Sequence, residues 1–174
     1  MSLEQTPRDW YGLFSSHIKG YTQEFVLAPL AWALPKPPVV LRWRRIKFNS
    51  ANKVLVPKTT RGIYSFIVCP QVQGEPAGEY VFYIGKVGAP DNTRGFRDRY
   101  REYLRELSTE NPERIEIALG LEQWQNNLWF YWAPIKNAAL IDECEKRLIQ
   151  CLRPPWNKKG KGIPQPPQPA FMTL

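Results

Sequence analysis

The chain has 174 residues, of which 43% are hydrophobic and 13% aromatic, enough for one packed domain with extensions and too apolar for a disordered polyelectrolyte. It carries 24 Lys and Arg against 16 Asp and Glu, and the formal net charge of +8 favours an anionic partner such as nucleic acid. The longest apolar run, residues 25–34, is interrupted by Pro29 and is too short to span a membrane, so we expect a soluble, cytoplasmic protein with no membrane partner.

Residues 1–59 form an N-terminal extension, aromatic up to Pro38 and basic after it, which we expect to pack on the domain that follows. From Arg42 to Arg61 there are seven basic residues and no acidic one. Such segments track the phosphate backbone of nucleic acids, and aromatic side chains among them stack on bases or wedge between them. The residues expected to act in this way are Arg42, Arg44, Arg45 and Lys47, with Trp43 and Phe48 as the aromatic pair. The alternative is a solvated charged strand.

Residues 60–160 show the periodic patterns of a folded domain, and residues 161–174 form a Pro-rich tail. Runs rich in β-branched and aromatic residues at 62–68, 80–85 and 128–133 predict strands. Apolar residues at helical spacing predict a helix near 96–107 and another over 137–152, with Asn137 as its N-cap. The order of these elements predicts a small α+β domain.

Two charged residues lie at the apolar faces of the predicted helices. On a helical wheel Glu145 falls inside the buried stripe of the last helix, whereas Glu143 falls on its outer face. A carboxylate in an apolar stripe must be paired, protonated or bound to a cation, so Glu145 is either a metal ligand or the partner of a buried arginine. Arg99 borders the apolar face of the earlier helix, from which its guanidinium either snorkels to solvent or reaches a phosphate.

Tyr64 and Tyr83 lie in predicted strands, close to Gly62 and Gly85 respectively, and a strand glycine allows backbone or ligand to approach closely. A phenol has a pKa near 10 and is a poor base unless cations lower that pKa, a role open to Arg99 and Lys86. Tyrosines in strands are also ordinary packing residues.

The ordered set of these residues resembles the GIY-YIG nuclease family. It consists of Gly62-Ile63-Tyr64, Tyr83-Ile84-Gly85 with Lys86, then Arg99, Glu145 and Asn157, over about 100 of the 174 residues. The resemblance implies a small central three-stranded antiparallel sheet flanked by helices. It also implies hydrolysis of phosphodiester bonds in DNA to 5′-phosphate and 3′-hydroxyl ends.

The resemblance implies a role for each of these positions. Tyr64 would deprotonate or orient the attacking water, Tyr83 would bind a phosphate oxygen or position the nucleophile, and Arg99 with Lys86 would stabilise charge on the scissile phosphate. Glu145 would hold a single Mg²⁺ or Mn²⁺ ion, with water and substrate oxygens as further ligands. The supporting positions are Gly62, Gly85, Tyr103, which stands where many members have His, and Asn157, which would tie the last helix to the strands.

The expected partner is DNA, and a second basic cluster that includes Lys158 and Lys159 would contact it. A restriction-type enzyme would read bases and would act as a homodimer on a palindromic site, whereas a repair, phage or single-strand-directed nuclease would read shape. A non-catalytic nucleic-acid-binding module on the same fold is the third alternative. His17, the only histidine, belongs to no motif, and the three cysteines lack the spacing of a zinc site. Three cysteines cannot form a closed set of disulfides, and Cys144 and Cys151 lie too far apart on one predicted helix to pair, so we expect reduced thiols.

Overall fold

The computed structural model describes residues 29–58, 60–70, 78–88, 94–109, 112 and 114–157, with no side-chain description for Pro29, Ile115 and Glu116. Of the residues expected to act in the site, Lys158 and Lys159 lie outside the described ranges, as do His17 and the Pro-rich tail. In the part of the chain that is described, no helix is long and apolar enough to cross a membrane.

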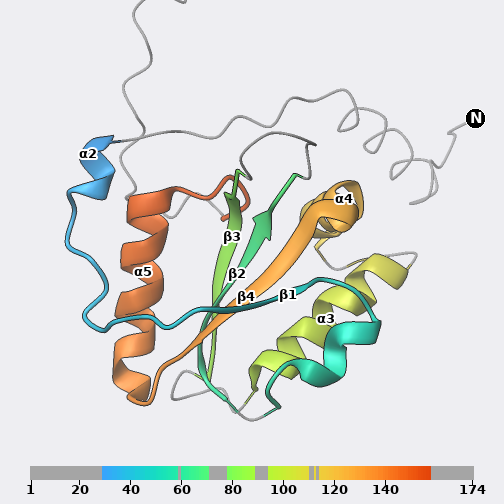
Figure 1. The fold of residues 1–174 in the computed structure, drawn as a ribbon, viewed down its shortest axis with the longest axis horizontal. Helices are drawn as coiled ribbons and strands as arrows, with labels where there is room; N and C mark the ends of the chain where they lie inside the picture. The colour runs from blue at the N-terminus through green and yellow to red at the C-terminus, as the bar shows by residue number, and fades with distance from the viewer. Residues whose placement is uncertain are drawn as a thin grey trace, which may run out of the picture.

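One antiparallel sheet forms the centre of the fold, and its strand order is β1-β4-β2-β3 (Figure 1). The strands are β1 (Arg44–Lys47), β2 (Gly62–Val68), β3 (Tyr80–Val87) and β4 (Leu128–Pro134). The expected three-stranded sheet is therefore corrected to four strands. β1 has only one partly buried side chain, that of Ile46, so its own pattern does not signal a strand. This segment is a strand because it pairs with the edge of β4 that β2 leaves free.

Helices cover both faces of the sheet, with α3 (Phe96–Ser108) and α4 (Ile115–Trp124) on one side and α5 (Ile141–Leu152) on the other (Figure 1). Shorter helical segments complete the described chain: α2 (Pro29–Trp32), η1 (Ala51–Leu55), η2 (Gln125–Asn127) and η3 (Ala138–Leu140). The expected helix over 137–152 is thus a 3₁₀ turn followed by α5. Asn137 caps the turn, since its side chain accepts a hydrogen bond from the Ala139 N–H at 3.1 Å.

Strand alternation divides the core into two layers. Tyr64 and Phe66 of β2 pack with the aromatic residues of α3, whereas Ile63 of β2 and Ile84 of β3 pack with α5. Phe48, expected to stack on bases, instead lies in the first layer with 3% of its surface exposed, its ring centroid 5.0 Å from that of Phe66. That expectation is wrong, because the chain turns Phe48 inward directly after β1. All three cysteines are free, as expected.

Candidate active site

The two glycine–tyrosine motifs meet across neighbouring strands. Tyr64 pairs with Gly85 in the register of β2 and β3, and a Cβ added to Gly85 would lie 2.4 Å from both Cζ and the hydroxyl oxygen of Tyr64. Gly85 therefore leaves the space that the phenol ring occupies. Gly62 has φ +146°, and a Cβ there would lie 2.2 Å from the Ala133 carbonyl oxygen of β4, so both glycines are required by close approach.

Three tyrosines gather on the α3 side of the sheet at this point. The hydroxyls of Tyr64 and Tyr103 are hydrogen-bonded at 2.8 Å. The Tyr83 ring centroid lies 6.1 Å from that of Tyr64 and 6.2 Å from that of Tyr103. A β-bulge leaves Phe82 without a partner on β2, and Phe82 and Tyr83 both pack on this core layer. Tyr64 and Tyr103 are fully buried, whereas Tyr83 is partly exposed.

Burial is the largest influence on the pKa values of Tyr64 and Tyr103. It raises the pKa of Tyr64 well above the ordinary value of 10.0, and the opposing influence of Arg99 is smaller. Burial likewise raises the pKa of Tyr103. Arg99 does lower the pKa of Tyr64, in the expected direction, but burial outweighs it and Tyr64 stays protonated at neutral pH. It can donate or accept a hydrogen bond but is a poor base.

Arg99 lies on α3 beside this tyrosine cluster with 24% of its side chain exposed. Its Nη1 donates to Glu102 Oε2 at 2.6 Å, and its Nε is buried without a hydrogen-bond partner among the described residues. Burial alone would lower the pKa of Arg99, but Tyr64 and Glu102 outweigh it and the pKa is raised. The guanidinium is a permanent cation with donors to spare, which suits a phosphate oxygen.

Lys86 and Glu145 form an ion pair, with Nζ 2.8 Å from Oε2. Asp142, one turn earlier on α5, lies 3.0 Å from the same ammonium. Hydrogen bonds to the two carboxylates outweigh burial and raise the pKa of Lys86. Glu145 thus has a cationic partner, but it is Lys86 and not an arginine. Glu143 lies on the outer face as expected, paired with Arg147 at 2.6 Å.

The expected site residues fall into two groups on opposite faces of the sheet. Tyr64 and Gly85 face α3, whereas Lys86, paired with Ile63 in the next row, faces α5 and reaches Glu145. β3 is the edge strand at this side of the sheet, and it carries Gly85 of the first group and Lys86 of the second. The Asn157 side chain accepts from the Ile84 N–H at 2.9 Å and donates to the Ile84 carbonyl at 2.7 Å, which ties the end of α5 to β3.

The basic strand lies at the other edge of the sheet, three strand spacings or roughly 14 Å from β3. Arg44 shares a cross-strand row with Trp132 and Tyr64 and is exposed. Arg45 faces the other side, where it pairs with Glu79 at 2.6 Å and lies over the Trp129 ring at 5.1 Å. The structure therefore does not bring the basic residues onto one face; Arg42, Trp43 and Lys47 are exposed.

A divalent ion fits the carboxylates that the structure brings together. Asp142 and Glu145 converge on one ammonium, so the position between them already suits a cation. Mg²⁺ keeps several waters and is commonly bound through one or two carboxylates. No group of three or more His, Cys, Asp or Glu side chains with metal-binding geometry is found in the described ranges.

Asp142 was missed because the wheel places it outside the apolar stripe; the signal was its spacing of three residues from Glu145. Arg94 and Glu102 were also missed; Glu102 forms ion pairs with both Arg94 and Arg99. Comparison of the chain with models of protein families, with curated proteins and with solved structures found no match.

Proposed function

We propose that the protein is a Mg²⁺-dependent DNA endonuclease that hydrolyses phosphodiester bonds to 5′-phosphate and 3′-hydroxyl ends. The observation that carries the proposal is the pairing of Tyr64 with Gly85, with Arg99 beside the same tyrosine cluster. The tyrosine cluster and Arg99 come from three separate segments, β2, β3 and α3, and Glu145 comes from α5 on the other face of the sheet. A packing role explains each tyrosine singly but does not require a half-buried arginine with an unpartnered Nε.

The proposed roles follow from exposure and charge. Tyr83 is the tyrosine of the cluster that a substrate reaches, and its phenol would hydrogen-bond a phosphate oxygen or the nucleophile. Tyr64 is buried and protonated, so it would hold Tyr83 and the attacking water in position and would not act as the base. Arg99 would stabilise charge developing on the scissile phosphate.

The α5 side would complete the site. Asp142 and Glu145 would hold the divalent ion, which supplies electrostatic stabilisation of the phosphate and lowers the pKa of bound water. Lys86, now paired with both carboxylates, would provide a second cation next to the phosphate. Exposed basic residues of the extension, Arg42, Arg44 and Lys47, would hold the DNA backbone away from the cut.

The test is cleavage of duplex, single-stranded and branched DNA over a Mg²⁺ titration. Glu145→Ala should abolish cleavage, because the remaining Asp142 cannot hold the ion alone. The matched control is Glu143→Ala, which removes a carboxylate two residues away on the outer face of α5 and should cleave like the parent protein. Undiminished cleavage by Glu145→Ala would refute the site.

A non-catalytic binding module is the second candidate, and the Lys86–Glu145 ion pair favours it, since such a pair also satisfies a half-buried carboxylate with no metal. Binding of all three substrates without cleavage of any would establish this alternative. If cleavage occurs, sequencing the ends of a digested plasmid separates two kinds of enzyme. One recurrent site indicates a restriction-type enzyme, a homodimer if that site is palindromic, and scattered ends indicate a shape-directed one.

A further inference from the structure

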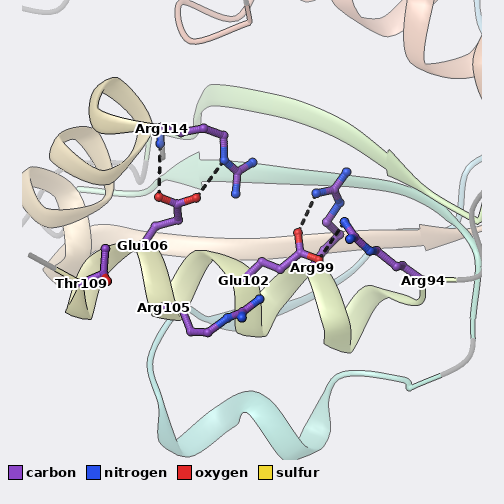
Figure 2. Close-up of a pocket in the computed structure, with 7 residues that line it drawn as sticks. All are labelled: Arg94, Arg99, Glu102, Arg105, Glu106, Thr109 and Arg114. Atoms are coloured by element: carbon purple, nitrogen blue, oxygen red, sulfur yellow. Dashed lines mark hydrogen bonds and ion pairs between the residues drawn. The ribbon is translucent and has the colours of Figure 1, made fainter. Parts of the chain in front are cut away.

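A cleft of about 540 Å³ lies along α3, next to Arg99 (Figure 2). Its charged lining comes from α3 and from the segments before and after it: Arg94, Arg99, Glu102, Arg105, Glu106 and Arg114. Four guanidinium groups against two carboxylates leave an excess positive charge in one concave surface. Only Arg99 of this set belongs to the nuclease site argued above.

The Glu102 carboxylate holds two of the arginines together. Its Oε2 accepts from Arg99 at 2.6 Å, and its Oε1 lies 3.2 Å from Arg94 Nη1. Glu102 is only 15% exposed, so the carboxylate is a fixed bridge between the two guanidinium groups. Both arginines line the cleft, with 55% of the Arg94 side chain and 24% of the Arg99 side chain exposed.

One turn later on α3, Glu106 holds Arg114 in a similar way. Its Oε1 lies 3.0 Å from Arg114 Nε, and the carboxylate is 9% exposed. The Arg114 guanidinium also lies over the Tyr103 ring, 4.7 Å from the ring centroid. Arg114 is therefore held by Glu106 and by Tyr103, and 32% of its side chain remains exposed.

Arg105 completes the lining and differs from the other three. Its guanidinium is exposed, and no described side chain forms an ion pair with it. An arginine in a concave basic surface without a carboxylate partner favours an external anion. In Figure 2 it extends over α3, below the Glu102 and Glu106 carboxylates.

We propose that this cleft binds two neighbouring phosphate groups of the nucleic-acid strand, beside the phosphate that Arg99 contacts. Arg94 binds one and Arg105 and Arg114 bind the next, while Glu102 and Glu106 position the guanidinium planes. The two carboxylates are four residues apart on α3, or about 6 Å along its axis, which is comparable to the separation of neighbouring phosphates on a strand. The identity of the strand as substrate rests on the proposed function.

The experiment measures binding without cleavage, by fluorescence anisotropy of labelled duplex and single-stranded DNA in EDTA over a series of salt concentrations. Arg105→Gln and Arg94→Gln should each weaken binding roughly three- to tenfold and reduce the slope of log K against log salt by about 0.7–0.9. Arg105 is exposed and unpaired among the described residues, so its variant leaves the fold intact. The matched control is Arg101→Gln, which removes the same charge from an exposed position of α3 outside the cleft.

A second probe keeps this inference separate from the nuclease assignment. Pyrophosphate, which carries two linked phosphates, should raise the melting temperature of the parent protein and of Arg101→Gln, and less so that of Arg105→Gln or Arg114→Gln. If the parent cleaves DNA but the cleft variants bind like Arg101→Gln, the phosphate subsite is refuted and the nuclease stands. If the cleft variants lose binding while no protein cleaves, the subsite stands and the nuclease assignment fails.

Discussion

Replacing Gly85 with alanine tests the central contact of the candidate site. The added Cβ would lie 2.4 Å from Cζ and from the hydroxyl oxygen of Tyr64, far inside van der Waals contact. The ring cannot withdraw, because Tyr64 is 1% exposed and stacks on Phe130 with centroids 5.5 Å apart. Overpacking of this kind costs about 1–3 kcal/mol. Displacing the hydroxyl from Tyr103 adds roughly 1 kcal/mol for a lost buried hydrogen bond.

We therefore expect Gly85→Ala to lower the free energy of unfolding by about 2–4 kcal/mol, measured by urea denaturation followed by tryptophan fluorescence. The control is Gly78→Ala, whose nearest neighbour is the flexible, 43% exposed side chain of Tyr80; its cost should stay within about 0.5 kcal/mol. DNA cleavage should fall with Gly85→Ala, because Tyr64 can no longer hold Tyr83 in place.

A double-mutant cycle locates the cause. In a Tyr64→Leu background the side chain ends before the position of the clashing atoms, so the added cost of Gly85→Ala should fall below about 1 kcal/mol. An equal cost in both backgrounds would refute the reasoning, since the penalty would then come from the β3 backbone and not from the phenol. A cost below 0.5 kcal/mol for the single variant would refute the close approach itself.

The other predictions concern the edge of β3 and the buried phenols. Asn157→Ala removes both hydrogen bonds to the Ile84 backbone and should destabilise the fold by about 1–3 kcal/mol in the same denaturation assay, whereas a neutral effect would mean that water replaces the amide. Because the pKa values of Tyr64 and Tyr103 are raised in the folded state, the unfolded chain loses these protons first as pH rises above about 10. Stability should then fall by up to about 1.4 kcal/mol per pH unit per tyrosine, and Tyr103→Phe should reduce that slope; an unchanged slope would show that the Tyr103 phenol is not protected from ionisation in the folded state.

Much of the fold follows from local patterns. The strand at 62–68 and the helix that begins at Phe96 match β2 and α3 because their apolar periods are strong and their ends are marked by glycine or proline. β1 was expected only as an alternative, a solvated charged strand, and no apolar period supported it. Its sequence, Arg-Arg-Ile-Lys, has one apolar residue, and only the unpaired edge of β4 makes it a strand.

The charged residues of α5 also show which features local patterns predict and which depend on tertiary contacts. The helical wheel placed Glu145 on the inner face of α5 and Glu143 on its outer face, and the Glu145 side chain is indeed the less exposed of the two, at 20% against 42%. Both positions depend only on helical geometry. Asp142 and Arg147 are neighbours of these carboxylates on α5 itself, at a spacing that helical geometry gives. Lys86, by contrast, becomes the partner of Glu145 only because β3 passes α5 at that point. Phe48 failed as a stacking residue for a similar reason: its burial is decided by the turn after β1, which its neighbours in sequence do not reveal.

The sequence by itself determined which residue types occur and which face of its own element each one occupies, since periods of 2 and 3.6 are local properties of the backbone. The tertiary structure decided that Tyr64 is buried and protonated, that the candidate residues divide between two faces of the sheet, and that four arginines line one cleft. The physical reason is that solvent exclusion and charge partners depend on strand order and helix docking, which join segments up to about a hundred residues apart.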